Sequence, residues 1–231
     1  MRSIWIGWDP READAFDVCQ RSIRMTGCHE QLSSINLDDM RSRGLYWRKT
    51  FRYLNGAGLY DAISGAAMST EFAISRFLTP VLADRGWALF MDCDMLVRRN
   101  LDELFALADP RYAVQVVKHP ELIGEGIKMD GQPQVRYRRK NWSSVMLFNV
   151  AHPSNKKISA MINSSPGRDL HAFGWLEDHE IGELPAEWNY LVGVSPHNPN
   201  PAIAHFTLGV PTMRGYERCQ FADEWRAVLE A

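Results

Sequence analysis

Two aspartates, Asp92 and Asp94, directly follow a short apolar run at residues 87–91 and precede three more apolar residues at 95–97. An apolar run of this length is typical of a buried strand, and two carboxylates at its end would be costly to bury without a compensating charge. Alternate residues of a strand point to the same face, so both carboxylates can reach one cation. Their hard oxygen ligands suit Mg²⁺, Mn²⁺ or Ca²⁺. The Asp-x-Asp pair therefore predicts a metal site, with a solvated strand end as the alternative.

Three further residues have side chains or backbone suited to such a site. His205 lies between apolar neighbours in AHFTLGVP (204–211), where it is either a satisfied core histidine or a ligand that completes a manganese site. Gly209, four residues later, would let a phosphate approach the backbone closely. Arg76 has a fork of donors that can clamp a diphosphate; the alternative is a surface arginine with its stem along apolar neighbours.

Two charged segments remain. The segment WLEDHE (175–180) gathers Asp178, His179 and Glu180. Acidic residues favour the first turn of a helix, so the segment is consistent with an ordinary helix start, and the functional alternative places these side chains in a ligand pocket. The basic run RYRRK (136–140) is interpreted as a solvated loop face, or as a loop that closes over an anionic substrate.

Alternating strand and helix patterns position these residues. They predict an α/β fold in a single domain over residues 1–231. Residues 38–68 are expected to be irregular, 118–142 to form a mobile loop or insertion, and Asn100 to cap a helix that carries Glu103. The remaining elements are predicted as strands at 3–8, 32–37, 87–91, 112–117 and 144–150, and as helices at 12–25, 70–82 and 154–162.

The composition excludes several classes of protein. A net charge of −2 lacks the basic balance of a nucleic-acid-binding protein. No apolar run approaches the roughly 20 residues that span a bilayer, the first ten residues lack a signal-peptide pattern, and the last ten lack a basic amphipathic tail. The four cysteines have no metal-like pairing, which fits a reducing compartment. We therefore expect a cytoplasmic protein without an integral membrane segment or a nucleic-acid partner.

Taken in order, these segments resemble the family 8 glycosyltransferases, retaining enzymes of the GT-A fold that use nucleotide-sugar donors. The resemblance covers most of the chain, and its most specific parts are the acid-pair segment and LPAEWN. It implies a GT-A-like domain with a mixed, mostly parallel central sheet flanked by helices, and transfer of a hexose, with a UDP-linked donor as the family's usual choice. The matching segments are IWIGWDPREADAF (4–16), STEFAISRFLTPVL (69–82), LFMDCDMLVRRNLDELF (89–105), SVMLFN (144–149), LEDHEIGELPAEWNYL (176–191) and AHFTLGVP (204–211).

The resemblance also implies how the donor is held. Asp92, Asp94 and His205 would bind a manganese (or magnesium) ion that bridges the donor diphosphate. The residues Gly7, Trp8 and Asp9, at the end of the first strand, would receive the base and ribose. Arg76 matches the family's helix arginine near the donor, and Gly209 falls close to its glycine beside the phosphates.

On the sugar side, the resemblance places Asp178 and His179 against the transferred sugar. If a covalent intermediate forms, Asp178 is the first candidate nucleophile and Glu180 the second. The alternative is attack on the face from which the leaving group departs, and the sequence leaves both open. The transition state is expected to be oxocarbenium-like.

The chain departs from the family's pattern at three places. His179 stands where the family usually has glutamine, and Trp142 and Ser144 replace an Asn-x-Gly before the apolar strand. A lysine expected soon after His205 is absent, which leaves Arg214 or the run at 136–140 as its substitute. The sequence is therefore interpreted as a divergent member.

Other functions were compared with this interpretation. A nucleotidyltransferase would open with a glycine-rich basic loop, and a dehydrogenase needs a glycine fingerprint after the first strand; residues 4–16 contain neither. A catalytically silent nucleotide-sugar-binding module remains the main alternative. The acceptor, whether glycan, glycolipid or protein, is not identified by the sequence, and its site is expected in the loops at 40–66 and 118–142.

Overall fold

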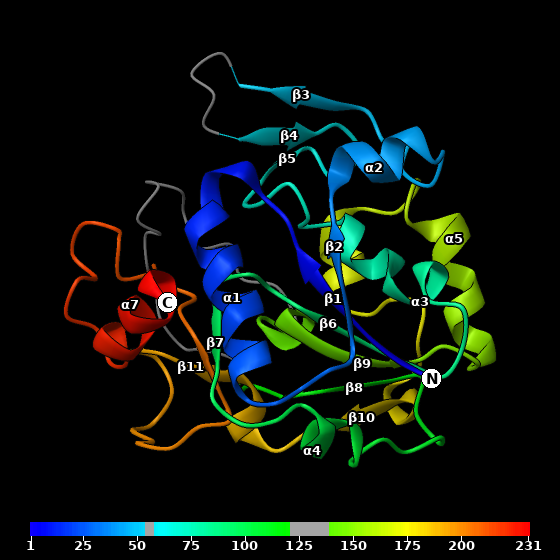
Figure 1. The fold of residues 1–231 in the computed structure, drawn as a ribbon. Coiled ribbons are helices and arrows are strands. Elements are labelled where there is room, and N and C mark those ends of the chain that lie inside the picture. Colours follow the sequence, from blue (N-terminus) through cyan, green and yellow to red (C-terminus); the bar gives the residue numbers. More distant parts are fainter. Residues whose placement is uncertain (54–57, 121–138) are drawn as a thin grey trace.

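The computed structural model describes residues 1–53, 58–120 and 139–231. These residues form an α/β domain around a six-stranded sheet with the order β10-β8-β9-β6-β1-β2 (Figure 1). The predicted α/β class is confirmed. The strands of the sheet are β1 (Arg2–Gly7), β2 (Gln31–Ile35), β6 (Trp87–Met91), β8 (Val114–Val116), β9 (Val145–Asn149) and β10 (Ile181–Glu183).

The strand directions bring the functional residues to one edge of the sheet. Strand β1 is parallel to β2 and β6, β10 is parallel to β8, and β9 is antiparallel to both of its neighbours. Every strand of this sheet except β9 therefore runs in the same direction, and their carboxyl ends form one edge, called the carboxyl edge below. Ligands of open α/β sheets bind at this edge.

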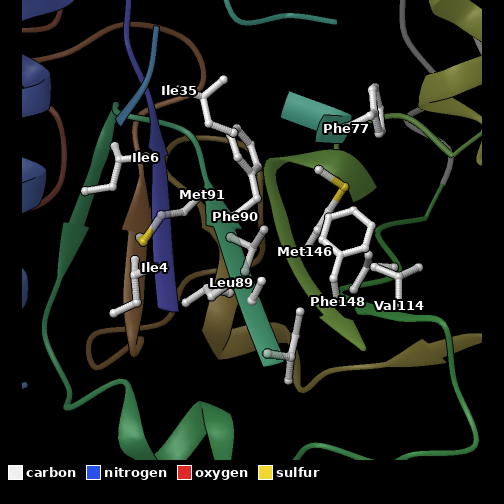
Figure 2. Close-up of a cluster of buried hydrophobic side chains, with 14 of the residues drawn as sticks. Ile4, Ile6, Ile35, Phe77, Leu89, Phe90, Met91, Val114, Met146 and Phe148 are labelled. Atoms are coloured by element: carbon white, nitrogen blue, oxygen red, sulfur yellow. The ribbon is translucent and has the colours of Figure 1, made fainter. Parts of the chain in front are cut away.

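The core fills the centre of the sheet, where β6 lies between β1 and β9. Leu89, Phe90 and Met91 are fully buried, as are Ile4 and Ile6 on β1 (Figure 2). The apolar run is nearly continuous because a strand covered on both faces has no solvated side. Helix α1 (Ala13–Met25) packs against β7 (Met95–Val97) and α7 (Ala222–Glu230), whereas α3 (Thr79–Leu82) packs against β6 and β9.

A second sheet positions His205. It has the order β11-β12-β7, with β11 at Tyr190–Leu191 and β12 at Ile203–His205. Strand β12 is antiparallel to β7 and sets His205 opposite Met95, the residue after Asp94. Residues more than 100 positions apart thereby become neighbours through backbone pairing.

Residues 38–68 are more regular than predicted. They contain most of helix α2 (Leu37–Ser42) and a three-stranded sheet, β3 (Thr50–Arg52), β4 (Leu59–Asp61) and β5 (Ala66–Met68). The expectation of an irregular segment is therefore wrong. Strands of three residues are too short for an alternation pattern, so the sequence gives little sign of them. In Figure 1 this small sheet projects away from the central sheet.

Two predicted helices are shorter than expected. Within 70–82 the helical residues begin at the 3-10 turn η2 (Ser75–Leu78) and continue into α3, and within 154–162 η4 (Pro153–Lys157) precedes α5 (Ile158–Met161). Asn100 accepts a hydrogen bond from the backbone of Asp102 at 2.8 Å, but the N-cap of α4 (Asp102–Phe105) is Leu101, so the predicted capping position is one residue too early. The other short elements are η1 (Pro10–Glu12), η3 (Trp142–Ser144), α6 (Gly167–His171), η5 (Asp178–Glu180) and η6 (Ala186–Asn189).

The loop predicted at 118–142 and the basic run at 136–140 lie largely outside the described residues, which omit 121–138. Within the part of the chain that the structure describes, no helix has the length and apolarity needed to cross a membrane.

Candidate functional site

Asp92, Asp94 and His205 meet at the carboxyl edge. The two aspartates lie between β6 and β7, and His205 ends β12. One ligand atom from each of the three side chains lies within 4.8 Å of the other two. The side chains of Asp92 and Asp94 are 13% and 24% exposed, so a small ion can reach them from solvent. These three residues are called the metal triad below.

The polar atoms of the metal triad fit a divalent cation. Oδ1 of Asp92 and Oδ1 of Asp94 are buried, and each faces a side-chain nitrogen, Nη1 of Arg76 at 2.7 Å and Nε2 of His205 at 3.3 Å. Nδ1 of His205 lies 2.8 Å from Oδ1 of Asn189, which can only accept a hydrogen bond, so Nδ1 donates and Nε2 faces Asp94 at 3.3 Å. A ring nitrogen fixed in this way is the usual support of a histidine ligand. Two carboxylates and one imidazole suit Mn²⁺ or Mg²⁺.

Arg76 is part of the same cluster. Its Nη1 lies 2.7 Å from Oδ1 of Asp92 as an ion pair and donates to the carbonyl of Ser143 at 3.0 Å. The guanidinium lies 5.2 Å from the ring centroids of both Phe72 and Phe90. Arg76 is buried, so the interpretation as a surface arginine is wrong. It supplies positive charge directly beside the first ligand of the metal triad.

Burial and the neighbouring charges shift the pKa values of all three residues of the metal triad. Burial raises the pKa of Asp92, and Arg76 only partly offsets this effect. Burial acts on Asp94 in the same direction, but the positive charge of His205 brings its pKa below the ordinary value. Burial lowers the pKa of His205, yet Asp94 outweighs burial and raises it. Asp94 and His205 therefore each favour the charged form of the other, and a cation bound between them would compete with the proton on His205.

Glu12 is a further acidic residue at this edge that the sequence did not single out. It ends η1, immediately after β1, and the thiol of Cys93 donates to its Oε2 at 3.0 Å. Burial and then the charge of Asp94 raise the pKa of Glu12 to about 7. In the sequence, Glu12 looks like an ordinary acid at a helix start. Its position directly after the first strand was the available signal, because parallel strands bring their carboxyl ends together.

This raised pKa predicts a pH-dependent stability. The pKa of Glu12 is 4.5 in the unfolded chain, so the folded protein holds this proton more tightly than the unfolded chain does. The free energy of unfolding therefore falls as pH rises from about 4.5 to 7. We expect Glu12→Gln to stabilise the metal-free protein at pH 8 by about 1–3 kcal/mol and to leave it nearly unchanged at pH 4. Urea unfolding at both pH values in chelator measures this difference, with exposed Glu183→Gln as the control. Equal stability of wild type and Glu12→Gln at pH 8 would contradict the assignment.

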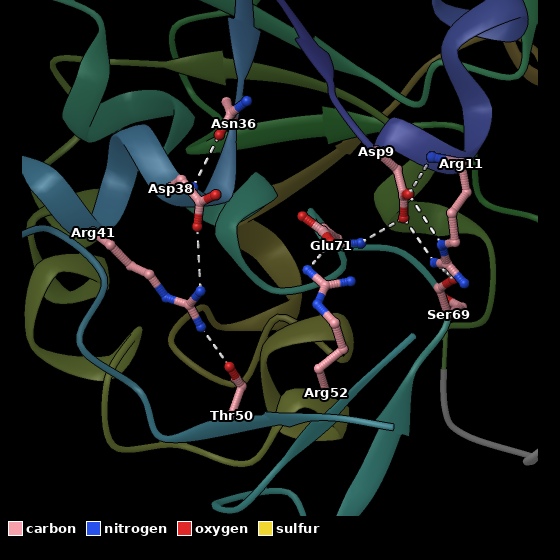
Figure 3. Close-up of polar contacts among 9 residues, drawn as sticks. All are labelled: Asp9, Arg11, Asn36, Asp38, Arg41, Thr50, Arg52, Ser69 and Glu71. Carbon is pink, nitrogen blue, oxygen red and sulfur yellow. Dashed lines mark hydrogen bonds and ion pairs between the residues drawn. The ribbon is translucent and has the colours of Figure 1, made fainter. Parts of the chain in front are cut away.

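Asp9 lies at the same edge, and its carboxylate is occupied by protein groups. It is fully buried and accepts hydrogen bonds from the backbone, Nε and Nη2 of Arg11 at 2.9, 3.0 and 2.7 Å, and from the backbone of Glu71 at 2.9 Å (Figure 3). The guanidinium of Arg11 also donates to the carbonyl of Ser69 at 2.9 Å. The role of Asp9 at the ribose stays a prediction, and Arg11 is a neighbouring cation that the sequence reasoning missed.

Gly7 and Trp8 precede Asp9 at the end of β1 and just beyond it. A Cβ on Gly7 would lie 2.3 Å from the ring of Phe72, so the close packing of this ring requires glycine. Trp8 is partly buried, with its ring edge-to-face against Phe16 at 4.8 Å. Both residues lie at the carboxyl edge, as a nucleotide site there would need; contact with a base stays a prediction.

The segment Asp178–Glu180 forms η5, before β10. Asp178 is exposed and forms an ion pair with the buried guanidinium of Arg139, which lies 5.5 Å from the ring centroid of Trp142. Trp142 belongs to η3, which also contains the Ser143 carbonyl bound by Arg76. These contacts therefore connect the segment Asp178–Glu180 to Arg76, beside the metal triad, through η3.

The other two residues of this segment have different surroundings. His179 is exposed. Glu180 accepts hydrogen bonds from Oγ of Ser154 and, at 2.8 Å, from the backbone of Glu177, and these bonds lower its pKa although burial acts to raise it. These contacts show Glu180 stabilising its own turn. The roles of His179 and Glu180 towards a sugar stay predictions.

Gly209 lies in the loop after β12, where its backbone donates to the carbonyl of Phe206 at 2.9 Å. A Cβ at this position would lie 2.9 Å from the ring of Tyr216, so this packing favours glycine. Arg214 is exposed in the same loop. Whether Gly209 and Arg214 contact a phosphate stays a prediction.

Comparison with known proteins supports a glycosyltransferase fold. No protein-family model matches the sequence. Protein CDI of Arabidopsis thaliana is 42% identical over 235 residues, with 98% of this chain and 85% of that protein covered.

Several solved glycosyltransferases are similar in structure. The galactosyltransferase LgtC, solved in complex with donor and acceptor sugar analogs, superimposes with a TM-score of 0.59 at 14% identity, covering 99% of this chain and 95% of LgtC. GlyE of Streptococcus pneumoniae gives a TM-score of 0.63 at 14% identity, and this chain, covered completely, spans 60% of the GlyE structure. Mouse xyloside xylosyltransferase 1 gives 0.53 at 10% identity, covering 91% of this chain and 100% of that enzyme. These identities show the fold alone, which is GT-A.

Proposed function

We propose a glycosyltransferase function for this chain, which belongs to the family of Protein CDI of Arabidopsis thaliana and has the GT-A fold. In this proposal it transfers a hexose from a nucleotide diphosphate sugar, with UDP as the first candidate nucleotide, to a glycan, glycolipid or protein acceptor with retention of configuration. The observation that carries the proposal is the metal triad, two carboxylates and one imidazole whose ligand atoms lie within 4.8 Å of one another at the edge where such folds bind ligands.

Each residue of the site has a proposed role. Asp92, Asp94 and His205 hold the divalent ion, which when bound supplies positive charge to the leaving diphosphate. Arg76 keeps Asp92 in place and adds positive charge at the same point. In the resemblance to family 8 glycosyltransferases, Gly7, Trp8 and Asp9 receive the nucleoside and Gly209 lies beside the phosphates. These assignments extend the proposal to the whole donor.

Asp178 and His179 are proposed to face the transferred sugar. A carboxylate there would stabilise an oxocarbenium-like transition state by its negative charge. In this structure Asp178 is paired with Arg139, so it must leave or share that partner to act on the sugar. Glu180 is the weaker candidate because Ser154 and Glu177 already bind its oxygens. Covalent catalysis and same-face attack both remain compatible with this arrangement.

The pairing of Asp178 with Arg139 specifically favours a second candidate, a nucleotide-sugar-binding module without transferase activity. The two candidates differ in turnover. Slow hydrolysis of the donor sugar in the presence of Mn²⁺ is expected of an enzyme and not of a silent module. An enzyme is favoured because the metal triad and Arg76 are both in place.

The proposal is tested by calorimetric titration of UDP into the purified protein, with Mn²⁺ and with chelator. We expect binding that depends on Mn²⁺, because the diphosphate and the metal triad would share the ion. A screen of UDP-glucose, UDP-galactose and other UDP-hexoses for Mn²⁺-dependent hydrolysis then follows. If UDP, GDP and the other nucleoside diphosphates all fail to bind with Mn²⁺, the proposed function is wrong and only the fold remains.

A further inference from the structure

His119 brings an imidazole to the carboxyl edge from a strand that does not contribute to the metal triad. It follows β8 by three residues, and β8 runs parallel to β6, with β9 between them. The chain therefore leaves β8 at the same edge at which β6 delivers Asp92. His119 is not among the described residues whose ligand atoms cluster within 4.8 Å, so it is a neighbour of the metal triad and not a fourth ligand in this arrangement.

Nε2 of His119 has no partner within the described part of the protein. The atom is buried, and no described group forms a hydrogen bond with it. A buried polar atom without a partner costs about 1–3 kcal/mol. Such an atom at the edge of a site needs an explanation, and a bound group that completes the hydrogen bond would remove the cost.

The backbone of His119 is held by hydrogen bonds to Trp142 of η3 and to Val117. Nε1 of Trp142 donates to its carbonyl at 2.9 Å, and its own backbone N–H donates to Val117 at 3.1 Å. Trp142 is followed by Ser143 and Ser144, whose carbonyls accept from Arg76 at 3.0 Å and from the backbone of Asp92 at 3.0 Å. The backbones of His119 and Asp92 are therefore both hydrogen-bonded to the same short segment, η3.

The charge of the ring restricts what it can bind. Burial, and next the positive charge of His205, lower the pKa of His119 to about 4, so the ring is neutral at physiological pH. A neutral imidazole offers one donor and one acceptor. It is suited to a hydroxyl, whereas the anionic diphosphate has better partners in the divalent ion and Arg76. A base with so low a pKa would contribute little to proton abstraction at neutral pH.

We propose that His119 is a sugar-binding residue whose Nε2 forms a hydrogen bond with a hydroxyl of the substrate beside the metal triad. The inference rests on the proposed function and deepens it, because it assigns a substrate contact to a residue to which the family resemblance gave no role. A hydroxyl of the donor hexose and the hydroxyl of a carbohydrate acceptor share this chemistry, and the experiment separates them.

The test compares wild type with His119→Ala, His119→Phe and His119→Gln. The phenylalanine keeps the ring without its nitrogens, and the glutamine offers a donor and an acceptor near the position of Nε2. His29→Ala is the matched control, because His29 is exposed just before β2, at the opposite edge of the sheet. Thermal unfolding identifies any variant that fails to fold, and His119→Phe replaces His119→Ala if the latter does.

Three measurements are made with Mn²⁺ present. They are the affinity for UDP, the affinity for the UDP-hexose that wild type binds most tightly relative to UDP, and the steady-state kinetics of donor hydrolysis and transfer, including KM for the acceptor. If the donor hydroxyl is the partner, His119→Ala and His119→Phe lose about tenfold in affinity for the UDP-hexose with UDP binding unchanged. If the acceptor hydroxyl is the partner, donor binding and hydrolysis are unchanged and KM for the acceptor rises about tenfold. Partial recovery in His119→Gln is expected in both cases.

Two outcomes would overturn the inference, and they are distinguishable. Wild type that binds UDP and UDP-hexose, with folded His119 variants indistinguishable from it in all three measurements, would overturn the role of His119 alone and leave water as the partner of Nε2. Wild type that binds neither UDP nor any UDP-hexose with Mn²⁺ would overturn the proposed function, and the role of His119 with it.

Discussion

Asp94→Asn is expected to abolish Mn²⁺-dependent turnover, with a loss of about 10³-fold or more. Asp94 is central to the metal triad because it supplies one ligand and also holds His205, whose Nε2 lies 3.3 Å from its carboxylate. Replacing the carboxylate by an amide removes a negative ligand and the partner that raises the pKa of His205. Loss of charge stabilisation from a bound metal is worth several kcal/mol, and 4 kcal/mol corresponds to about 10³ in rate.

The measurement for this variant has two parts. Calorimetry should show Mn²⁺-dependent UDP binding in wild type and none in Asp94→Asn at the same concentrations, and donor hydrolysis should fall in parallel. Asp84→Asn is the matched control, because Asp84 is exposed and precedes β6 at the opposite end of the same strand. Wild-type turnover in a folded Asp94→Asn protein would mean that the metal triad does not hold the catalytic ion.

The sequence predicted the parts of the site that depend on local pattern. Asp92 and Asp94 follow an uninterrupted apolar strand, so the strand and the edge could be inferred from the local pattern. The two acids lie in the bend between β6 and β7, so strand alternation is not what brings them together. The pairing of β12 with β7 brings His205 beside them, and its role as a metal ligand stays a prediction. The association of His205 with the acids depended on knowing which residue types share a metal, because nothing in its local spacing indicates the partner strand.

The residues that the sequence missed are those defined by long-range contacts. Asn189 becomes relevant only because Nδ1 of His205 donates to it, and Ser143 only because its carbonyl accepts from Arg76. Glu12 and His119 look like an ordinary helix-start acid and a loop histidine until the strand order brings β1, β6 and β8 to one edge. The side chains that support a site are brought to it by the fold, and their spacing in the sequence gives no sign of that role.

The stability of the small sheet β3–β5 also depends on long-range contacts. Arg48 and Asp61 form an ion pair with side chains 0% and 1% exposed. Nε of Arg48 donates to Oδ1 of Asp61 at 3.0 Å, and its Nη1 donates to the carbonyls of Ile162 and Ser165 at 2.8 and 2.7 Å. The pair therefore fastens β4 to the chain between α5 and α6, 100 residues further on. The sequence contained both residues but no sign that they meet.

Arg48→Met is expected to destabilise the protein by about 3–5 kcal/mol, because it leaves the Asp61 carboxylate buried without its cation. Urea unfolding at pH 7 measures the loss. Arg43→Met is the matched control: its partner Asp39 lies 3.5 Å away, the two side chains are 47% and 53% exposed, and such pairs contribute about 0–1 kcal/mol.

A double variant separates the buried charge from the lost packing. Arg48→Met with Asp61→Leu removes both charges and should recover part of the stability, since replacing a whole buried ion pair with apolar groups costs less than removing one partner. Burial would raise the pKa of Asp61, but Arg48 and Ser64 bring it below 3.8, so the wild-type contribution is present at neutral pH and declines as the solution is acidified below that value. A loss for Arg48→Met no larger than that for Arg43→Met would show that apolar contacts hold β4, and that the ion pair does not determine the position of the small sheet.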